Sequence, residues 1–234
     1  LKKRELEIYT KDIESDEVNI YFLNPINNDV DVITSNNISK PFKGSYLKNI
    51  CFKECKTFDK DEIVLQGNLK FENSIFLRKN QKLKILPGSR LEFSDDSGIF
   101  GYGSLDILGT KDNLVTLGAL DNSWRGIHLY NHEKNILKNL KVSNTIPKEI
   151  DYFRTGGISI IGGAVDVENF IVENNVFEDA INLVDVVFSI TNLKISNTTS
   201  DAIDIDNGKG ILESSSFFCV GTGIEGGDAI DVSF

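Results

Sequence analysis

The fold of this chain is decided by two nearly identical segments, D-A-I-N-L at residues 179–183 and D-A-I-D-I at residues 201–205. In both, a small residue precedes an isoleucine, and a second apolar residue follows the isoleucine by two positions. Apolar residues at alternate positions are typical of a β-strand that buries one face. The two segments therefore predict one strand that recurs in successive repeats.

The pair of a small residue and isoleucine recurs in a series of seven, at intervals of 24, 28, 31, 23, 22 and 27 residues. The seven isoleucines are Ile75, Ile99, Ile127, Ile158, Ile181, Ile203 and Ile230. No repeat contains the amphipathic stretch of roughly 10–12 residues that a crossover helix needs. The repeats predict an all-β parallel solenoid of about seven coils, with these isoleucines in one buried interior column. A β-sandwich is the alternative, but it gives no reason for the pair to recur.

A second set of strands precedes the isoleucine strands. Its segments are residues 69–71, 91–93, 140–142, 170–172 and 193–195, which we align from coil to coil, and Phe217 continues the set. Small polar residues recur at fixed offsets around these segments: Asn139, Asn169, Asn192 and Ser214 on one side, and Asn144, Asn174 and Asn197 on the other. Such residues favour bends with a left-handed backbone, so we expect a bend at each end of this strand.

Residues 1–60 do not show the repeat. Residues 17–22 and 30–34 alternate around N-P-I-N-N at residues 24–28, which predicts two strands and a turn. We therefore expect a small β module or N-terminal cap at 1–60, followed by the solenoid at 61–234. Cys51 and Cys55 either form a disulfide or are free thiols, and the sequence leaves both open.

The charge of the chain lies almost entirely in its last third. Of the 234 residues, residues 164–234 carry 13 acidic and two basic side chains, whereas residues 1–163 carry 22 acidic and 23 basic ones. The net charge of −10 disfavours nucleic acid as a partner, and no apolar run approaches the ~18 residues of a membrane span. The asymmetry suggests a cation site or a basic partner.

The last strand lies next to Phe234, so we expect further protein segments or a contact to cover the final coil.

Over residues 62–234, the sequence resembles the right-handed parallel β-helix of the pectin-lyase-like superfamily. The resemblance rests on I-L-P-G-S at 85–89, G-T at 109–110, S-W-R-G-I at 123–127 and the D-A-I-D segments. It implies an extracellular or cell-surface protein. It does not specify an activity, because the superfamily includes lyases, hydrolases, epimerases, adhesins and inert surface modules.

Stacking the last three coils predicts two columns of outward-facing acidic side chains. Asp179, Asp201 and Asp228 share one column, and Asn182, Asp204 and Asp231 share the other. Coils lie about 4.8 Å apart, and carboxylates at that spacing repel one another by roughly 1 kcal/mol in water. A hard cation would offset this repulsion, so the five aspartates are candidate ligands for Ca²⁺. In the alternative interpretation, they cap bends and bind no metal.

Other side chains are candidates for contact with a sugar. Asp201 and Asp228 resemble the acid and base of galacturonan hydrolases, although Ala229 stands where that family has a further aspartate. The candidate substrate-binding residues are Trp124, Arg125, His128, Tyr152 and Arg154, the last two within a loop expected at residues 144–155. Core packing is the alternative role for Trp124.

These features together lead to one expected function and one alternative. We expect a secreted or cell-surface β-helix that serves as a scaffold or glycan-binding module, with Ca²⁺ as the candidate cofactor. The alternative is a polysaccharide lyase or glycoside hydrolase that acts on an acidic polysaccharide. An enzyme needs a groove in which acid and base groups converge, whereas a binding module does not.

Overall fold

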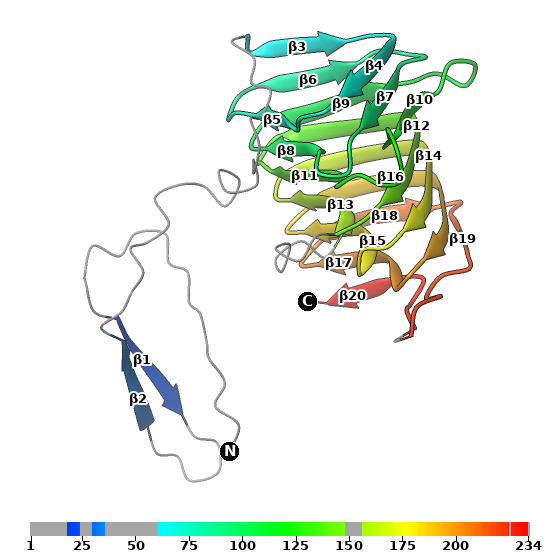
Figure 1. Cartoon of the computed structure of the whole chain (residues 1–234). Helices are drawn as coiled ribbons and strands as arrows, with labels where there is room; N and C mark the ends of the chain where they lie inside the picture. The colour runs from blue at the N-terminus through cyan, green and yellow to red at the C-terminus, as the bar shows by residue number, and fades with distance from the viewer. Residues whose placement is uncertain (1–17, 24–29, 36–59, 148–155, 225, 234) are drawn as a thin grey trace. The chain divides into compact units, whose positions relative to one another are not determined.

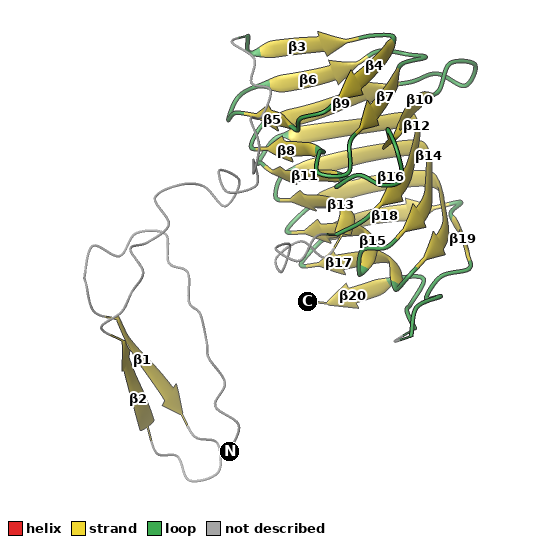
Figure 2. Ribbon diagram, viewed as in Figure 1, coloured by secondary structure: helices red, strands yellow, loops and turns green. Residues whose placement is uncertain are grey.

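The computed structural model describes residues 18–23, 30–35, 60–147, 156–224 and 226–233. Strands connected by turns and loops make up these ranges, and no helix occurs in them (Figure 2). None of the described segments is therefore a helix with the length and hydropathy needed to traverse a bilayer. The chain divides into two compact units, Leu1–Ile50 and Cys51–Phe234.

The first unit contains an antiparallel pair, β1 (Val18–Leu23) and β2 (Val30–Ser35). The alternating sequence predicted both strands to within one residue at each end. The expected turn at residues 24–28 and the two cysteines at 51 and 55 lie outside the described residues.

The second unit is a parallel β-solenoid of about seven turns, as the repeat predicted (Figure 1). One face is a seven-stranded parallel sheet in which each coil contributes one strand. Its strands are β5 (Ile75–Leu77), β8 (Ile99–Gly101), β11 (Ile127–Tyr130), β13 (Gly156–Ile161), β15 (Asp179–Val184), β17 (Asp201–Asp206) and β20 (Asp231–Ser233).

The other two faces belong to one eleven-stranded sheet that bends along a corner. Three long strands run through this corner: β12 (Lys134–Thr145), β14 (Ala164–Asn175) and β16 (Val187–Thr198). Short strands flank them on both sides of the corner. They are β3 (Glu62–Leu65), β4 (Asn68–Phe71), β6 (Lys82–Ile85), β7 (Arg90–Phe93), β9 (Ser104–Leu108), β10 (Val115–Ala119), β18 (Lys209–Glu213) and β19 (Ser216–Phe218).

Left-handed asparagines form the corner of the long strands. Asn139, Asn169 and Asn192 have φ angles of 47°, 53° and 57°, a region that L-residues rarely adopt and that asparagine tolerates. The side-chain amide of Asn169 donates to Oδ1 of Asn139 at 3.0 Å, and that of Asn192 donates to Oδ1 of Asn169. The asparagines therefore both bend each coil and join it to its neighbour.

A second asparagine ladder lies where the same strands end. Asn144, Asn174 and Asn197 have φ angles of 61°, 57° and 57°, and their amides also bond from coil to coil. The predicted left-handed bends are thus confirmed at both positions. Cys219, at φ 52°, continues this column in the next coil, although a cysteine does not by itself indicate a left-handed bend.

The isoleucine column lies inside the solenoid. Ile75, Ile99, Ile127, Ile158, Ile181 and Ile203 pair in direct register from strand to strand, and each is at most 3% exposed. The seventh member departs from the prediction, since Ile230 is 44% exposed and precedes β20. It belongs to the last described coil, which has a neighbouring coil on one side only.

The alignment of the second strand set was wrong by two residues at its middle. In the structure, Leu91 pairs with Leu117, and Leu117 pairs with Val142, so that Phe93 lies opposite Ala119. The sequence alignment had placed Phe93 opposite Val142. The error arose because β10 lies between the two coils and was not recognised as a member of the set.

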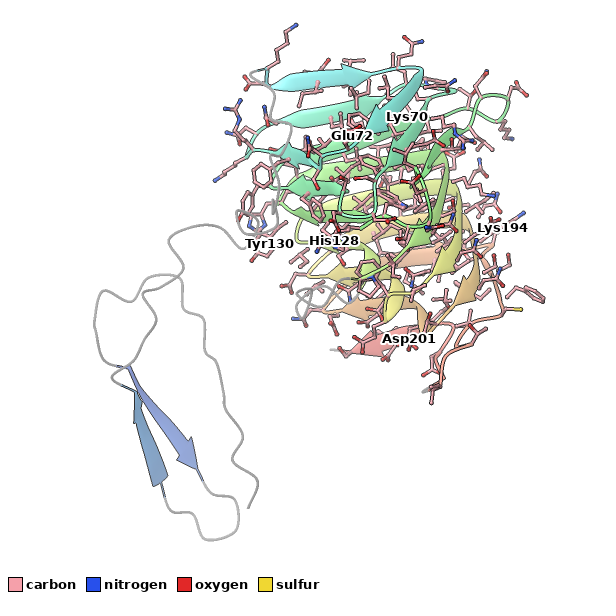
Figure 3. All side chains as sticks on the ribbon, viewed as in Figure 1. Lys70, Glu72, His128, Tyr130, Lys194 and Asp201 are labelled. Atoms are coloured by element: carbon pink, nitrogen blue, oxygen red, sulfur yellow. The ribbon has the colours of Figure 1, made fainter. Side chains whose placement is uncertain are left out.

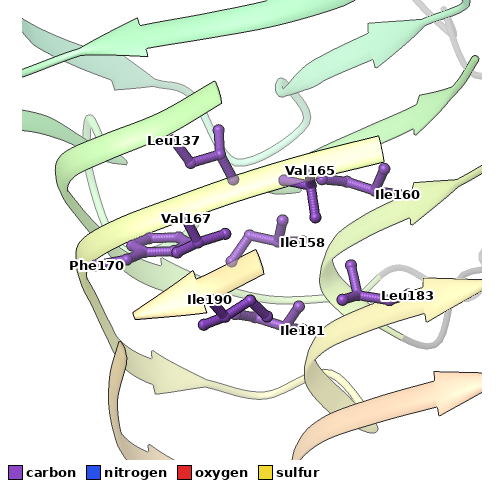
Figure 4. Close-up of a pocket in the computed structure, with 9 residues that line it drawn as sticks. All are labelled: Leu137, Ile158, Ile160, Val165, Val167, Phe170, Ile181, Leu183 and Ile190. Carbon is purple, nitrogen blue, oxygen red and sulfur yellow. The ribbon is translucent and has the colours of Figure 1, made fainter. Parts of the chain in front are cut away.

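A small gap in the interior is lined only by apolar side chains (Figure 4). Nine side chains line this gap: Leu137, Ile158, Ile160, Val165, Val167, Phe170, Ile181, Leu183 and Ile190. A gap without polar groups offers nothing to orient a ligand, and voids of this kind stay dry. It is therefore a packing feature of the core.

Candidate functional site

The outer surface of the seven-stranded sheet changes character along the stack. One outward position, directly after each interior isoleucine, forms a column that we call the outer column. It contains Phe76, Phe100, His128, Ser159, Asn182, Asp204 and Asp231, paired in register. The column is aromatic in the first coils and acidic in the last.

A second outward position lies three residues after each isoleucine. It is occupied by Arg78 in the first coil and Ser233 in the last, and we call the five positions between them the outer stripe. Its members are Tyr102, Tyr130, Ile161, Val184 and Asp206. Tyr130, Ile161, Val184 and Asp206 are in direct register in four successive coils. All five side chains are at least partly exposed, so the stripe is open to solvent along its length.

Aromatic rings contact one another at the first end of this face. The Tyr102 ring packs edge-on against Phe76, with centroids 6.2 Å apart, and against Tyr130, with centroids 6.3 Å apart. Tyr130 is 51% exposed, and its side chain projects from the opposite side of the solenoid to Lys194 (Figure 3). Rings held by their neighbours on a sheet present a pre-formed apolar surface at little cost in conformational entropy.

The middle of the outer column, unlike the outer stripe, is closed to solvent. His128 stacks on Phe100 at 5.3 Å and contacts Phe177 at 5.6 Å, and its Nε2 lies 2.6 Å from the carbonyl oxygen of Arg125. The guanidinium of Arg125 lies over the Phe100 ring. All four of these side chains are at most 3% exposed. Arg125 and His128 were predicted to contact a substrate, but both are buried in this packed cluster.

The other predicted sugar-binding residues are Trp124, Tyr152 and Arg154. Trp124 is fully buried, stacks on Phe93 with centroids 4.8 Å apart, and donates its indole N–H to the carbonyl oxygen of Ser143 at 2.8 Å. This position fits the core-packing alternative. Tyr152 and Arg154 lie outside the described residues. The sequence analysis did not select Phe76 and Tyr102. Their offsets of one residue from Ile75 and three residues from Ile99 could have identified both as outward-facing.

The two predicted acidic columns exist, with one correction. Asp179 pairs with Asp201, and Asn182, Asp204 and Asp231 pair in order. Asp179 was expected to face solvent but is only 2% exposed. Its neighbour in the preceding coil is Gly156, and its carbonyl oxygen accepts a hydrogen bond from the buried amide of Asn175. Asp179 therefore belongs to the packed part of this face.

Asp201 bonds to the backbone of the next coil. Its Oδ1 accepts a hydrogen bond from the backbone N–H of Asp228 at 2.6 Å. This contact is the one expected when an aspartate caps a bend. Figure 3 shows Asp201 near the last coil, away from Tyr130 and His128.

Asp204 lies at the centre of the acidic end. Its partial burial raises the pKa of the carboxyl group, and the negative charges of Asp206 and Asp231 raise it further. Asn182 partly opposes this effect by donating its amide to Oδ2 at 2.9 Å. Within the part of the chain that the structure describes, no group of three or more His, Cys, Asp or Glu residues is arranged to hold a metal ion.

Several charged side chains of the eleven-stranded sheet are paired between coils. On the eleven-stranded sheet, lysines pair with acidic residues of a neighbouring coil at N–O distances between 2.5 and 3.2 Å. The pairs are Lys82–Asp106, Lys84–Glu62, Lys134–Asp166, Lys138–Glu168 and Lys141–Glu173. In the described ranges, no lysine or arginine pairs in this way with the aspartates at the acidic end of the seven-stranded sheet.

Comparisons with known proteins do not add a family. No protein-family model, no curated protein and no solved structure shows significant similarity to this chain.

Proposed function

We propose that this solenoid is a glycan-binding module and that the outer stripe of the seven-stranded sheet is its binding surface. We also propose that it belongs to the pectin-lyase-like superfamily and acts outside the cell or at its surface. The parallel coils and the sequence resemblance support this second proposal. The observation that supports glycan binding is the exposed ring of Tyr130, braced by Tyr102 on a rigid sheet.

The physical argument concerns the two faces of a sugar ring. A pyranose presents C–H groups on one face and hydroxyl groups at its edge, so it stacks on an aromatic ring while its hydroxyls stay hydrated. Tyrosine adds a phenolic O–H that can donate to a sugar oxygen. Ile161 and Val184 extend the apolar surface over the next two coils, and an extended chain can therefore lie along the stack.

The test is a binding measurement on a glycan array, followed by titration of the glycans that bind. Tyr130→Ala should weaken binding at least about tenfold, as expected for an aromatic residue at the centre of a contact surface. The matched control is Phe218→Ala, because Phe218 is 72% exposed but lies on β19 of the other sheet. Equal effects of the two substitutions, or no effect of Tyr130→Ala on any bound glycan, would refute the proposed surface.

A further inference from the structure

The outer stripe leads from an aromatic surface to a pair of carboxylates. Tyr130 and Asp206 occupy the same position three coils apart, and the strands between them are in direct register. Parallel strands lie about 4.8 Å apart, so the stripe spans roughly 14 Å from Tyr130 to Asp206. Ile161 and Val184 are partly exposed between them. A linear oligosaccharide a few rings long can therefore contact both ends at once.

At the acidic end, Asp206 of the outer stripe lies beside Asp204 of the outer column. Asp204 and Asp206 alternate with an interior isoleucine on β17, so their side chains leave the sheet on the same side. The hydroxyl of Ser233 donates to Asp206, and the amide of Asn182 donates to Asp204. Both contacts are with neutral groups. They orient the two carboxylates without cancelling their charge.

The last coils of the solenoid contain few basic residues. After residue 164 the sequence has only two basic residues, Lys194 and Lys209, and these lie on β16 and β18 of the eleven-stranded sheet. Asp231 of β20 is in register with Asp204 and adds a further negative charge on the same face. The mutual repulsion is visible in Asp204, whose pKa is raised by burial and then by Asp206 and Asp231.

We infer that the ligand of the outer stripe is a polycationic amino-sugar chain, with a ring stacked on Tyr130 and protonated amines paired with Asp204 and Asp206. This inference rests on the proposed glycan binding and specifies the class of glycan. Charge complementarity favours such a chain. The same carboxylates disfavour a uronic acid chain, because they would place like charges side by side. The stripe thus selects against the acidic polysaccharides expected from the sequence resemblance.

The experiment compares three oligosaccharides of equal length by calorimetric titration at about pH 6, where amines are protonated and most carboxylates are ionised. The probes are β-1,4-linked glucosamine, its fully N-acetylated counterpart, and an oligogalacturonate. The glucosamine oligomer should bind roughly three- to tenfold more tightly than the acetylated one, as expected for two exposed ion pairs. Added salt should reduce this preference.

A double variant tests the role of the carboxylates. Asp204→Asn together with Asp206→Asn should remove the preference for the glucosamine oligomer over the acetylated one. The matched control is Glu213→Gln, since Glu213 is an exposed acid on β18, away from this face. Far-UV circular dichroism verifies that each variant is folded. A preference that survives in the double variant would overturn the inference.

The outcomes separate the inference from the function on which it rests. If the acetylated or uronate oligomer binds as well as glucosamine, and Tyr130→Ala weakens that binding, the glycan surface stands and only the amino-sugar inference is refuted. If no oligosaccharide binds, both are refuted. If tetralysine binds as tightly as the glucosamine oligomer and Tyr130→Ala does not affect either, the acidic end recognises basic peptides instead.

Discussion

Replacing Ile181 with alanine measures how much of the solenoid's stability resides in its interior column. Ile181 is 3% exposed, in register with Ile158 and Ile203. The substitution removes three buried carbon atoms, a loss of transfer free energy of about 2.4 kcal/mol at ~0.8 kcal/mol each. The new void joins the gap that Ile181 already lines with Leu183, so the site cannot collapse easily. The cavity contribution raises the expected cost to about 3–4 kcal/mol.

The control substitution is Ile230→Ala in the same column. Ile230 is 44% exposed, so about half of the transfer free energy is at stake and no enclosed void forms, which predicts a cost of about 1 kcal/mol. Urea denaturation gives both values, with circular dichroism and the emission of Trp124 as two reporters whose coincidence shows cooperative unfolding. If Ile181→Ala costs no more than Ile230→Ala, the coils do not share one continuous core.

Substitutions at two further positions test the acidic end and the asparagine corner. Because folding raises the pKa of Asp204, the folded chain binds that proton more tightly than the unfolded chain, so stability falls as the pH rises from the ordinary value of 3.8 through the raised value. Asp204→Asn should therefore raise the melting temperature near neutral pH, with the gain disappearing at pH values below 3.8; an equal gain at every pH would contradict the assignment. Asn169→Ala should cost about 2–4 kcal/mol in urea denaturation, since it places alanine at φ 53° and removes two bonds between coils. Asn169→Gly should recover about 1 kcal/mol of that loss, and equal costs for both variants would show that backbone handedness is not the constraint.

Much of the solenoid could be predicted because its signals are local. The alternation around each interior isoleucine gives the strand and its buried face, and left-handed asparagines mark the bends on their own. The strand β10 was missed because Val115–Ala119 has no asparagine at the usual offsets, and Gly118 and Ala119 weaken its alternation. Missing this one strand was enough to shift the alignment of Phe93 by two residues.

The candidate site was harder to predict because exposure is a property of the whole fold. His128 and Tyr130 are two residues apart on one strand and both point outward, yet the first is buried and the second is exposed. Nothing in the local sequence distinguishes them. Asp179 and Asp201 share a register position and differ in the same way. The acidic end itself was predictable, since the repeat places Asp204, Asp206 and Asp231 on one face.

The corner after the long strands accepts chains of different length without any change in register. The connection from β12 to β13 spans residues 146–155, whereas β14 to β15 uses residues 176–178 and β16 to β17 uses residues 199–200. The asparagine ladder before this corner and the isoleucine pairing after it continue unbroken through all three coils. The length of this connection can therefore vary without changing the register of the strands that flank it. For protein engineering, the same corner is a natural place to graft a foreign peptide beside the seven-stranded sheet.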